Sequence, residues 1–514
     1  PNPAYETAVN DGGRSFTSGG SRPCPEGLDI FGNNALSESC AAFLQIRTNN
    51  LTELKQDMIE GTVTGSVFDL PAGPLQIAVG ADYRRNSYRF TPDPAGNDLV
   101  GSFGSLPVSG ETSVYEVYGE AAIPVLRDLP LVRALDLNLA YRYSDYDLSG
   151  GVSTYKASVE WEMFDALRLR GGYQRAIRAP NVTELFNPQV AAAFLLGQED
   201  PCNFDSAVRR GPDAAAVRQL CIGQGVPASI VDSYKSTFAG TQTIQGGNPD
   251  LDPEKADTYT AGLVWAPRFA SPVLESLSVS VDYYNLRLEE AISSLSPDIV
   301  FRRCFNIDGD NPTYSADDPN CQAIERNPAS GAPDRTFAPY FNLGAIKTSG
   351  IDFQLDWGFP LSAIGLSEDA GRLSLNAVAN YLIAFEVQPS SGSDFTDYTG
   401  TLGYAAADNN GAHPRWKANT SLTYALDPLS VSLRWYYVGK MRDINGGPGL
   451  DPYSRFDLSG NLRVRDDLRV SFGVSNLFDK EPLKTFGGLP GNTDSGTYDP
   501  LGRRYFISAT MSFR

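Results

Sequence analysis

The residue types that most often carry out enzyme chemistry are scarce in this chain. His413 is its only histidine, so a serine or cysteine nucleophile activated by an imidazole base would have to use that residue. His413 precedes Pro414 at an expected strand entrance, where a structural role is the better interpretation. No phosphate-binding loop or dinucleotide-binding glycine pattern follows an expected strand. The sequence therefore predicts a protein that is not an enzyme and that binds no cofactor.

The six cysteines fall into three pairs that are close together in the sequence. The pairs are Cys24 and Cys40, Cys202 and Cys221, and Cys304 and Cys321. An even number at short spacings is typical of disulfides in an oxidising compartment, and each would contribute roughly 3 kcal/mol for a loop of this size. Metal ligation is the alternative, but the sequence has no CxxC pair with accompanying histidines. We therefore expect three disulfides and no metal site.

Alternating apolar and polar residues recur along the whole chain and predict β-strands. The side chains of a strand point to opposite faces with a period of two. From Tyr505 to Phe513 the odd positions are apolar and the even positions are mostly serine and threonine, with Phe506 as the exception. The same pattern recurs at 135–143, 277–283, 351–357, 429–437, 456–462 and 468–475. Stretches of about ten such residues, with aromatic residues at their ends, are typical of an antiparallel transmembrane β-barrel.

The connections between these strands alternate in length, which favours a barrel over a soluble sandwich. Short joints lie at 70–74, 164–166, 425–428 and 465–467, and somewhat longer ones at the same alternate positions lie at 125–133, 266–275 and 359–371. Long joints lie between them, at 176–254, 293–340, 387–412, 440–451 and 480–502. Outer-membrane barrels have short periplasmic turns and long extracellular loops, whereas a sandwich has no reason to sort its loops in this way. We therefore predict a multi-pass barrel in the bacterial outer membrane, with each cysteine pair on its outer side.

Composition agrees with strands that meet lipid on one face. The chain lacks an apolar run of about 18 residues, the length that a membrane helix needs. Its 42 Lys and Arg residues and 61 Asp and Glu residues give a formal net charge of −19, which argues against nucleic acid as a partner. The expected partner is the lipid of the outer membrane.

The number of strands indicates that the barrel is incomplete in this chain. About fifteen strands of the required length start near Lys55, whereas bacterial barrels have an even number with both ends in the periplasm. We therefore expect residues 1–54 to be the remnant of an extracellular loop and residues 55–514 to be the barrel strands. The chain begins at Pro1 without a signal peptide, so we expect the closing strands and any part that fills the lumen to lie upstream. They should remain associated, because an open sheet leaves two unpaired edges in lipid.

Four short segments resemble blocks of one protein family. Residues 172–186 (GYQRAIRAPNVTELF) resemble the pattern R-x-x-R-A-P-x-x-x-E-L-F, and residues 247–255 (GNPDLDPEK) resemble G-N-P-x-L-x-P-E. Residues 474–480 and 498–504 resemble two blocks near the family's C-terminus. In this order, the four resemble the barrel of the TonB-dependent outer-membrane receptors. The chain departs from the family by ending on Arg514 rather than on an aromatic residue.

The resemblance implies a barrel of about 22 strands filled by an N-terminal plug domain. The strands of this chain would be its last fifteen or so, and the plug, the first strands and the TonB box that contacts the energising complex would lie upstream. In this interpretation Arg175, Arg178 and Glu184 are charges of the lumen wall or rim that contact the plug. The alternative is that these residues are lumen charges satisfied locally, with no dedicated partner.

The resemblance also implies a function, namely energised uptake of a scarce solute that the long loops capture and the plug admits. A passive porin-like channel and a surface scaffold that displays disulfide-braced loops are the alternatives. Four tyrosines near the outer end could stack on sugars or aromatic ligands, or could form a membrane-interface belt. They are Tyr340, Tyr404, Tyr436 and Tyr453. The negative net charge of the chain disfavours a strongly anionic ligand, but it does not decide among iron chelates, cobalamin, sugars and peptides.

Overall fold

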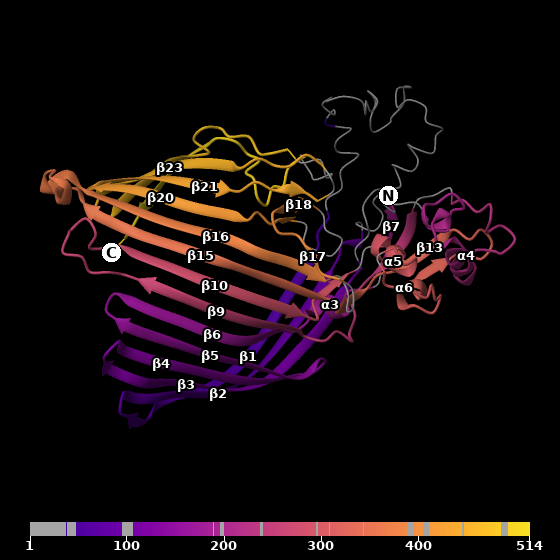
Figure 1. Cartoon of the computed structure of the whole chain (residues 1–514), viewed down its shortest axis with the longest axis horizontal. Helices are drawn as coiled ribbons and strands as arrows, with labels where there is room; N and C mark the ends of the chain where they lie inside the picture. Colours follow the sequence, from indigo (N-terminus) through magenta and orange to yellow (C-terminus); the bar gives the residue numbers. More distant parts are fainter. Residues whose placement is uncertain are drawn as a thin grey trace.

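One large antiparallel sheet dominates the structure (Figure 1). The computed structural model describes residue 38 and residues 48–513, except 95–105, 189, 196–199, 237–239, 295–296, 308, 343, 389–393, 404–410, 445–446 and 485–491. Within this part of the chain the sheet has 16 strands, all but one of them on a single path in sequence order. The path runs through β1 (Leu51–Leu70), β2 (Gly73–Thr91), β3 (Val108–Leu129), β4 (Val132–Tyr146), β5 (Gly150–Phe164), β6 (Leu167–Arg178), β9 (Glu254–Trp265), β10 (Ser278–Glu289), β15 (Ala345–Pro360), β16 (Arg372–Gln388), β20 (Trp416–Leu426), β21 (Leu429–Val438), β23 (Tyr453–Arg465), β24 (Leu468–Ser475) and β25 (Arg504–Met511). The short strand β17 (Thr396–Asp397) adds to β16 beside this path, and the predicted antiparallel sheet is confirmed.

The two edges of the sheet are β1 and β25. Among the described residues, β1 pairs with β2 alone and β25 pairs with β24 alone. β1 begins at Leu51, ahead of the expected start near Lys55. The reason is that backbone pairing with β2 continues to Leu51, opposite Thr91, although the side-chain alternation lapses there. Most of residues 1–54 lie outside the described part, so their assignment to an extracellular loop stays a prediction.

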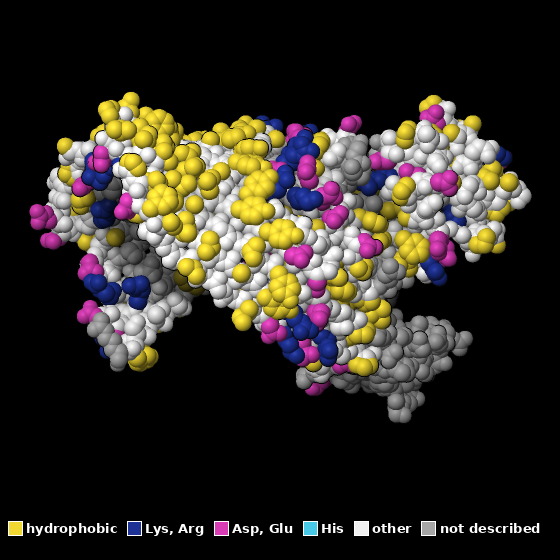
Figure 2. Space-filling model, turned by 90° about the horizontal axis from the view of Figure 1, so that it is seen from below, with side chains coloured by type: hydrophobic (Ala, Val, Ile, Leu, Met, Phe, Trp, Pro, Cys, Tyr) yellow, Lys and Arg dark blue, Asp and Glu magenta, His cyan; other side chains and the backbone are white. Residues whose placement is uncertain are grey.

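The register gives the sheet one polar face and one apolar face. A polar row across β1 to β4 consists of Glu60, Asp82, Glu116 and Ser144, and an apolar row on the other face consists of Val63, Val79, Gly119 and Tyr141. Large apolar side chains stay exposed on the second face, with exposed fractions of 74% for Ile59 and 79% for Ile507. Figure 2 shows hydrophobic side chains gathered over much of the strand surface on the side that it displays. An apolar surface of this kind indicates contact with lipid.

The connections sort by length as the sequence predicts, with two exceptions. At one end, residues 71–72, 130–131, 165–166, 427–428 and 466–467 are tight turns. The joints 266–277 and 361–371 at this end are longer, and the second contains η3 (Leu361–Ile364) and η4 (Glu368–Ala370). At the other end, the long connections are 92–107, 179–253, 290–344, 389–415, 439–452 and 476–503. One exception is 147–149, a short turn at the end that carries the long connections. The other is the longer joint expected at 125–133, because backbone pairing of β3 with β4 continues to Leu129 and Val132 and leaves only a tight turn.

Two of the long connections, 179–253 and 290–344, fold together into a small domain, which we call the outer domain (Figure 1). Its sheet has the order β12 (Ile324–Arg326), β13 (Pro333–Phe337), β8 (Gly240–Gln245) and β7 (Val190–Leu195). Its helices are η2 (Val208–Arg210), α4 (Ala214–Gly223), α5 (Pro297–Cys304) and α6 (Pro319–Gln322). The parallel pairing of β13 with β8 joins the two connections. No helix in the described ranges combines the length and the apolar character that crossing a bilayer would require.

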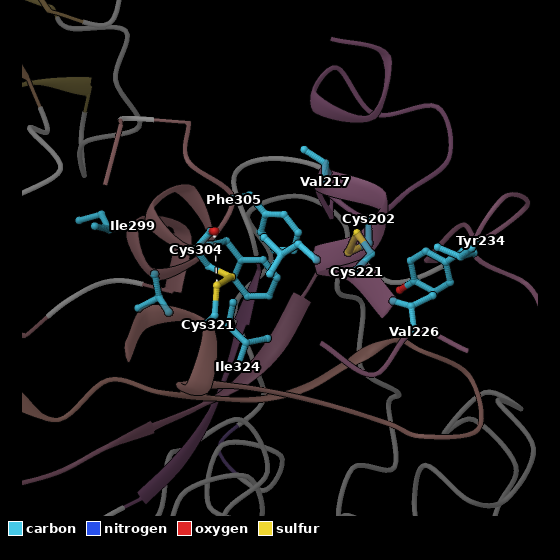
Figure 3. Packing of buried hydrophobic residues seen from close by; sticks show 14 residues of the cluster. Cys202, Val217, Cys221, Val226, Tyr234, Ile299, Cys304, Phe305, Cys321 and Ile324 are labelled. Atoms are coloured by element: carbon cyan, nitrogen blue, oxygen red, sulfur yellow. Dashed lines mark hydrogen bonds between the residues drawn. A yellow bond between two sulfur atoms is a disulfide. The ribbon is translucent and has the colours of Figure 1, made fainter. Parts of the chain in front are cut away.

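The outer domain has its own hydrophobic core, drawn in Figure 3. Its buried members are Cys202, Val217, Leu220, Cys221, Val226, Val231, Tyr234, Ile299, Val300, Phe301, Cys304, Phe305, Cys321 and Ile324. Two of the predicted disulfides, Cys202–Cys221 and Cys304–Cys321, lie in this core. The third predicted pair, Cys24 and Cys40, lies outside the described residues. The core draws residues from both connections, so the two segments stabilise each other.

A buried ion pair crosses the same domain. The Nη1 and Nη2 atoms of Arg326 donate to the Asp200 carboxylate at 2.7 and 2.8 Å, and the two side chains are 0% and 1% exposed. The Tyr234 hydroxyl and the backbone N–H of Cys202 also donate to this carboxylate, at 2.8 and 3.0 Å. Asp200 thus has the hydrogen bonds that a buried carboxylate requires.

Short strands, a second buried cluster and a short helix give structure to other parts of the connections. β11 (Ile292–Ser294) pairs with β14 (Tyr340–Asn342), and β18 (Thr401–Gly403) lies between β19 (Gly411–Ala412) and β22 (Arg442–Asp443). A second buried cluster consists of Leu402, Met441, Leu450, Tyr453 and Tyr498. The short helix α3 (Val182–Phe186) follows β6.

Candidate functional site

Three charged side chains form a cluster at the outer end of the polar face. Arg178 is the last residue of β6, Glu254 is the first residue of β9, and Glu184 lies in α3. The Nη1 atom of Arg178 donates to both oxygens of Glu184 at 3.0 and 2.9 Å, and its Nε and Nη2 atoms donate to Glu254 at 2.6 and 2.8 Å. The two carboxylates are 12% and 11% exposed. One guanidinium therefore faces two shielded carboxylates, and the cluster retains a negative charge.

The local sequence explains why Glu184 reaches Arg178. The chain leaves β6 before Pro180, because proline has no N–H group for the ladder. Asn181 then caps α3: its side-chain oxygen accepts from the N–H groups of Thr183 and Glu184, at 2.9 Å each. The Glu184 carboxylate accepts in return from the N–H of Asn181 at 2.7 Å. This reciprocal capping box holds the carboxylate beside Arg178.

The second family-like segment, 247–255, packs directly against the first. The N–H of Gly247 donates to the carbonyl of Asn187 at 2.7 Å, and the N–H of Asn248 donates to the carbonyl of Glu184 at 2.8 Å. A Cβ atom at position 247 would lie 2.6 Å from backbone atoms of Leu185 and Asn187, so this close approach requires glycine. Glu254, at the end of the segment, was not among the predicted site residues, although its place in the resembling pattern was a usable signal.

Arg175 does not join this cluster. A separation of three residues along a strand places two side chains on opposite faces, so Arg175 lies on the face opposite Arg178. Its Nε and Nη2 atoms donate to Asp257 at 2.9 and 2.6 Å, and the Tyr173 hydroxyl donates to the same carboxylate at 2.8 Å. A plug inside the lumen would meet Arg178 and Glu184 but not Arg175. Plug contact keeps geometric support for the first two residues only, and it stays a prediction.

A second charged group on the polar face was not predicted. Asp82 and Glu116 lie opposite each other on β2 and β3 and are 8% and 5% exposed. Glu116 accepts from Ser144 and from Arg142 Nη1, the latter at 3.2 Å, and lies 3.6 Å from Arg84. Among the described residues, no group of three or more His, Cys, Asp or Glu is arranged to hold a metal ion. Arg84 and Arg142 pair with Glu116, whereas the Oδ1 atom of Asp82 is buried without a hydrogen bond among the described residues.

A large cavity lies between this group and α3. It has a volume of about 830 Å³, and its wall includes Gln56, Arg84 and Tyr146 of the sheet together with Asn181 and Leu185. Volumes of this size suit a small ligand or a packed segment of another domain. The cavity adjoins the segment 179–185 that carries Glu184, so a single occupant would reach both places.

The four candidate tyrosines separate into different environments. Tyr436 and Tyr453 lie on the polar face of β21 and β23, in register with Arg455 and Val438 respectively. A membrane-interface belt would occupy the opposite face, where the Tyr173 and Tyr259 rings stack with centroids 4.7 Å apart. Tyr340 lies in β14 and is paired with Ser294 of β11, and Tyr404 lies outside the described residues. The belt interpretation therefore fails for Tyr436 and Tyr453.

The match to a known family follows from sequence as well as from shape. The family model described as "TonB dependent receptor-like, beta-barrel" matches residues 4–477. This chain belongs to that family. Barrels of the TonB-dependent receptors lie in the outer membrane of Gram-negative bacteria. The apolar face therefore meets outer-membrane lipid, and the long connections lie outside the cell.

Individual relatives are distant but cover most of the chain. The probable TonB-dependent siderophore receptor PirA of Acinetobacter baumannii is 20% identical over 493 residues, which are 94% of this chain and 55% of the relative. The haem/hemopexin utilization protein C of Haemophilus influenzae is 22% identical over 456 residues, which are 85% of this chain and 48% of the relative. The chain thus spans about half the length of these relatives.

A solved structure shares the fold. The ferric enterobactin receptor PfeA of Pseudomonas aeruginosa, in a mutant form bound to enterobactin, superposes with a TM-score of 0.55 at 18% identity. The superposition covers 90% of this chain and 55% of that chain. The described sheet is therefore the portion of a TonB-dependent barrel that this chain contributes.

Proposed function

We propose that this TonB-dependent barrel takes up a scarce iron-containing solute, with an upstream plug gating its lumen and TonB supplying the energy. Relatives named as siderophore and haem receptors support the choice of solute class. The observation that carries the proposal of a gated lumen is the cluster of Arg178, Glu184 and Glu254. In an open porin, water would fill the lumen beside this cluster. Water would solvate the charged groups, and they would need no partner from another domain.

The electrostatics of the cluster favour a cation from the plug. Two carboxylates that are 12% and 11% exposed share one arginine, so one negative charge is unbalanced. Partly buried charges are costly unless they are paired and hydrogen-bonded. An arginine or lysine of the plug would balance the charge and hold the plug in its correct position in the lumen.

Removing the unbalanced charge should weaken plug control. We expect Glu254→Gln, which removes one negative charge and leaves Glu184 paired with Arg178, to lower energised uptake about tenfold, because loss of a charge-assisted hydrogen bond costs roughly 1.5 kcal/mol. Initial rates of radiolabelled solute uptake in whole cells measure the effect. The control is Glu160→Gln, also on the polar face but 51% exposed beside Arg168. Equal uptake by both variants would contradict the plug contact.

Energy dependence distinguishes the proposed receptor from its alternatives. Cells that produce the intact protein should accumulate ferric siderophore or haem, and a protonophore should abolish the accumulation. Uptake that persists with the protonophore would indicate a passive channel, and surface binding without uptake would indicate a scaffold. We propose no catalytic step: the ring of His413 stacks on Phe385 with centroids 4.0 Å apart, which supports a structural role for the single histidine.

A further inference from the structure

A row of charged side chains crosses the lipid-facing side of the sheet near its outer end. Its members are opposite one another in register on β6, β9, β10 and β15, and they are Arg175, Asp257, Arg287 and Lys347. Lys255 of β9 and Glu289 of β10 form a second pair on the same face, two residues nearer the long connections. We call these six residues the outward charged patch. The patch faces away from the lumen, so neither a plug nor a solute inside the lumen accounts for it.

Tyrosine rings indicate the height of the patch relative to the membrane. Tyr173 and Tyr259 are paired in register on the same face as Arg175 and Asp257, two residues farther from the long connections. A strand rises about 3.3 Å per residue, so the patch begins about 7 Å beyond the two tyrosines along the strands. Aromatic residues at the ends of membrane strands lie at the level of the lipid headgroups. The patch therefore lies at this level, where charges on the lipid-facing side cost little.

Both carboxylates of the patch are already paired with arginines. Asp257 accepts from the Nε and Nη2 atoms of Arg175 at 2.9 and 2.6 Å. The Nη2 atom of Arg287 lies 2.9 Å from Glu289 Oε1, and the Arg287 side chain is 52% exposed. Arg287 is also opposite Asp257 in register, but Arg175 neutralises that carboxylate. A guanidinium has five N–H donors, so Arg287 keeps further donors available for a ligand.

The two lysines of the patch form no ion pair within the described part of the chain. Lys255 is opposite Glu289, which Arg287 already pairs, and the Nζ atom of Lys347 lies 3.5 Å from the centre of the Phe395 ring. Glu386 of β16 is opposite Lys347 in register and limits the patch on that side. The patch thus has four cations and two carboxylates, or three carboxylates with Glu386. Its charge is positive, although the whole chain has a net charge of −19.

We propose that the outward charged patch binds the phosphorylated headgroup of a lipid in the outer leaflet of the outer membrane. Lys255, Arg287 and Lys347 donate to the phosphate oxygens, because ammonium and guanidinium groups bind phosphate through charge-assisted hydrogen bonds. The acyl chains of the same lipid lie on the apolar strand surface below Tyr173 and Tyr259. A dissolved anion would have no such apolar contact, so the two parts of the surface together select a lipid. The inference does not depend on the proposed uptake.

Native mass spectrometry of the intact protein in a non-ionic detergent tests the site. The probes are lipid A that carries both phosphates, the same lipid A after removal of its phosphates, and inorganic phosphate. We expect phosphorylated lipid A to bind at least about tenfold more tightly than the phosphate-free form, because each lysine or arginine near an anionic lipid raises the affinity roughly fivefold. An excess of inorganic phosphate should not displace lipid A.

Two double variants separate the patch from the general charge of the protein. Lys255→Met with Lys347→Met should weaken binding of phosphorylated lipid A about thirtyfold, because two contacts are lost. The matched control is Lys156→Met with Lys417→Met, which removes two lysines from the polar face of β5 and β20 and should leave binding unchanged. Lys255→Arg with Lys347→Arg should bind lipid A as the wild type does, because arginine keeps both charges.

Arg175 is a positioning residue in this proposal, because it acts through Asp257. Arg175→Met leaves the Asp257 carboxylate unpaired beside Arg287, and we expect it to weaken lipid A binding roughly fivefold. Adding Asp257→Asn to this variant should restore the binding. A merely structural role of Arg175 would not be reversed by removing the carboxylate.

Three results would overturn the site. The first is equal binding of lipid A with and without its phosphates, which would mean that only the acyl chains are held. The second is displacement of lipid A by inorganic phosphate, which would indicate a site for a dissolved anion. The third is that the methionine variant of Lys255 and Lys347 binds lipid A as well as the control variant does. Failure of the uptake proposal is a separate outcome: lipid A binding would remain while accumulation of solute ignored the protonophore.

Discussion

Arg326→Met is expected to destabilise the outer domain by about 3–5 kcal/mol, because it leaves the buried Asp200 carboxylate without its charge partner. Both side chains are almost fully buried, at 0% and 1% exposure, so solvent screens the charge little. Hydrogen exchange of outer-domain peptides, measured by mass spectrometry on the intact protein, reports the local opening free energy. The barrel strands serve as an internal reference, since they do not share this core.

The control for this variant is an arginine of the same small sheet. Arg335 lies 3.9 Å from Glu325, and the two side chains are 52% and 50% exposed. Exposed ion pairs contribute about 0–1 kcal/mol, so Arg335→Met should change the opening free energy little. An Arg326→Met protein that opens no more readily than the Arg335→Met protein would show that the buried pair is dispensable.

The pH dependence of the outer domain should reverse in the same variant. Burial raises the pKa of Asp200, but the charge and hydrogen bonds of Arg326, together with the hydrogen bonds from Cys202 and Tyr234, outweigh it, so the pKa lies below its ordinary value of 3.8. In the wild type, the ionised Asp200 carboxylate therefore stabilises the outer domain. This stabilisation is complete above pH 3.8 and is lost as the pH falls through the lower, folded-state pKa. In Arg326→Met burial acts without the arginine and raises the pKa, so the variant should gain stability as the pH falls from neutral.

Phe301→Ala is expected to loosen both halves of the outer domain, at a cost of about 3–5 kcal/mol. Phe301 lies in α5, within the connection 290–344, and is 0% exposed. Its cluster includes Val217 and Leu220 of α4, which belong to the other connection. Hydrogen exchange should therefore rise in α4 as well as in α5. Increased exchange in α4, which belongs to the other connection, would show specifically that the two connections share one core.

An exposed phenylalanine of the same domain provides the comparison. Phe204 is 46% exposed, and surface substitutions usually change stability by less than about 0.5 kcal/mol. Phe204→Ala should therefore leave exchange in α4 near the wild-type rate. If Phe301→Ala raised exchange in α5 while α4 stayed protected, the two connections would be independent loops that only lie next to each other.

The outer domain gives the long connections a definite structural role. An ordered domain loses less conformational freedom on binding than two free loops would. Its disulfides brace each connection, while the core, the β8–β13 pairing and the Asp200–Arg326 pair join the two. The structure thus places an ordered domain at the end of the sheet that carries the long connections.

The strands, their faces and most of the sorting of the connections could be read from the sequence; the turns at 130–131 and 147–149 could not. These features are local: the period of two sets which side chains share a face, and tight turns need only a few residues. The two observed disulfides were predictable for the same reason, since their partners are 19 and 17 residues apart. Even the separation of Arg175 from Arg178 followed from the odd spacing of the two residues along β6.

The tertiary structure alone decided which distant segments meet. Asp200 and Arg326 are 126 residues apart, and no periodic pattern relates them. The pairing of Glu254 with Arg178 depended on β9 lying beside β6 across a connection that forms its own domain. The cavity beside α3 depended on the register of β1 to β4, which brings Gln56, Arg84 and Tyr146 to one place. Local patterns determine the face of a strand on which a side chain lies. Contacts between remote segments arise from packing of the whole chain, and no local pattern in the sequence reveals them.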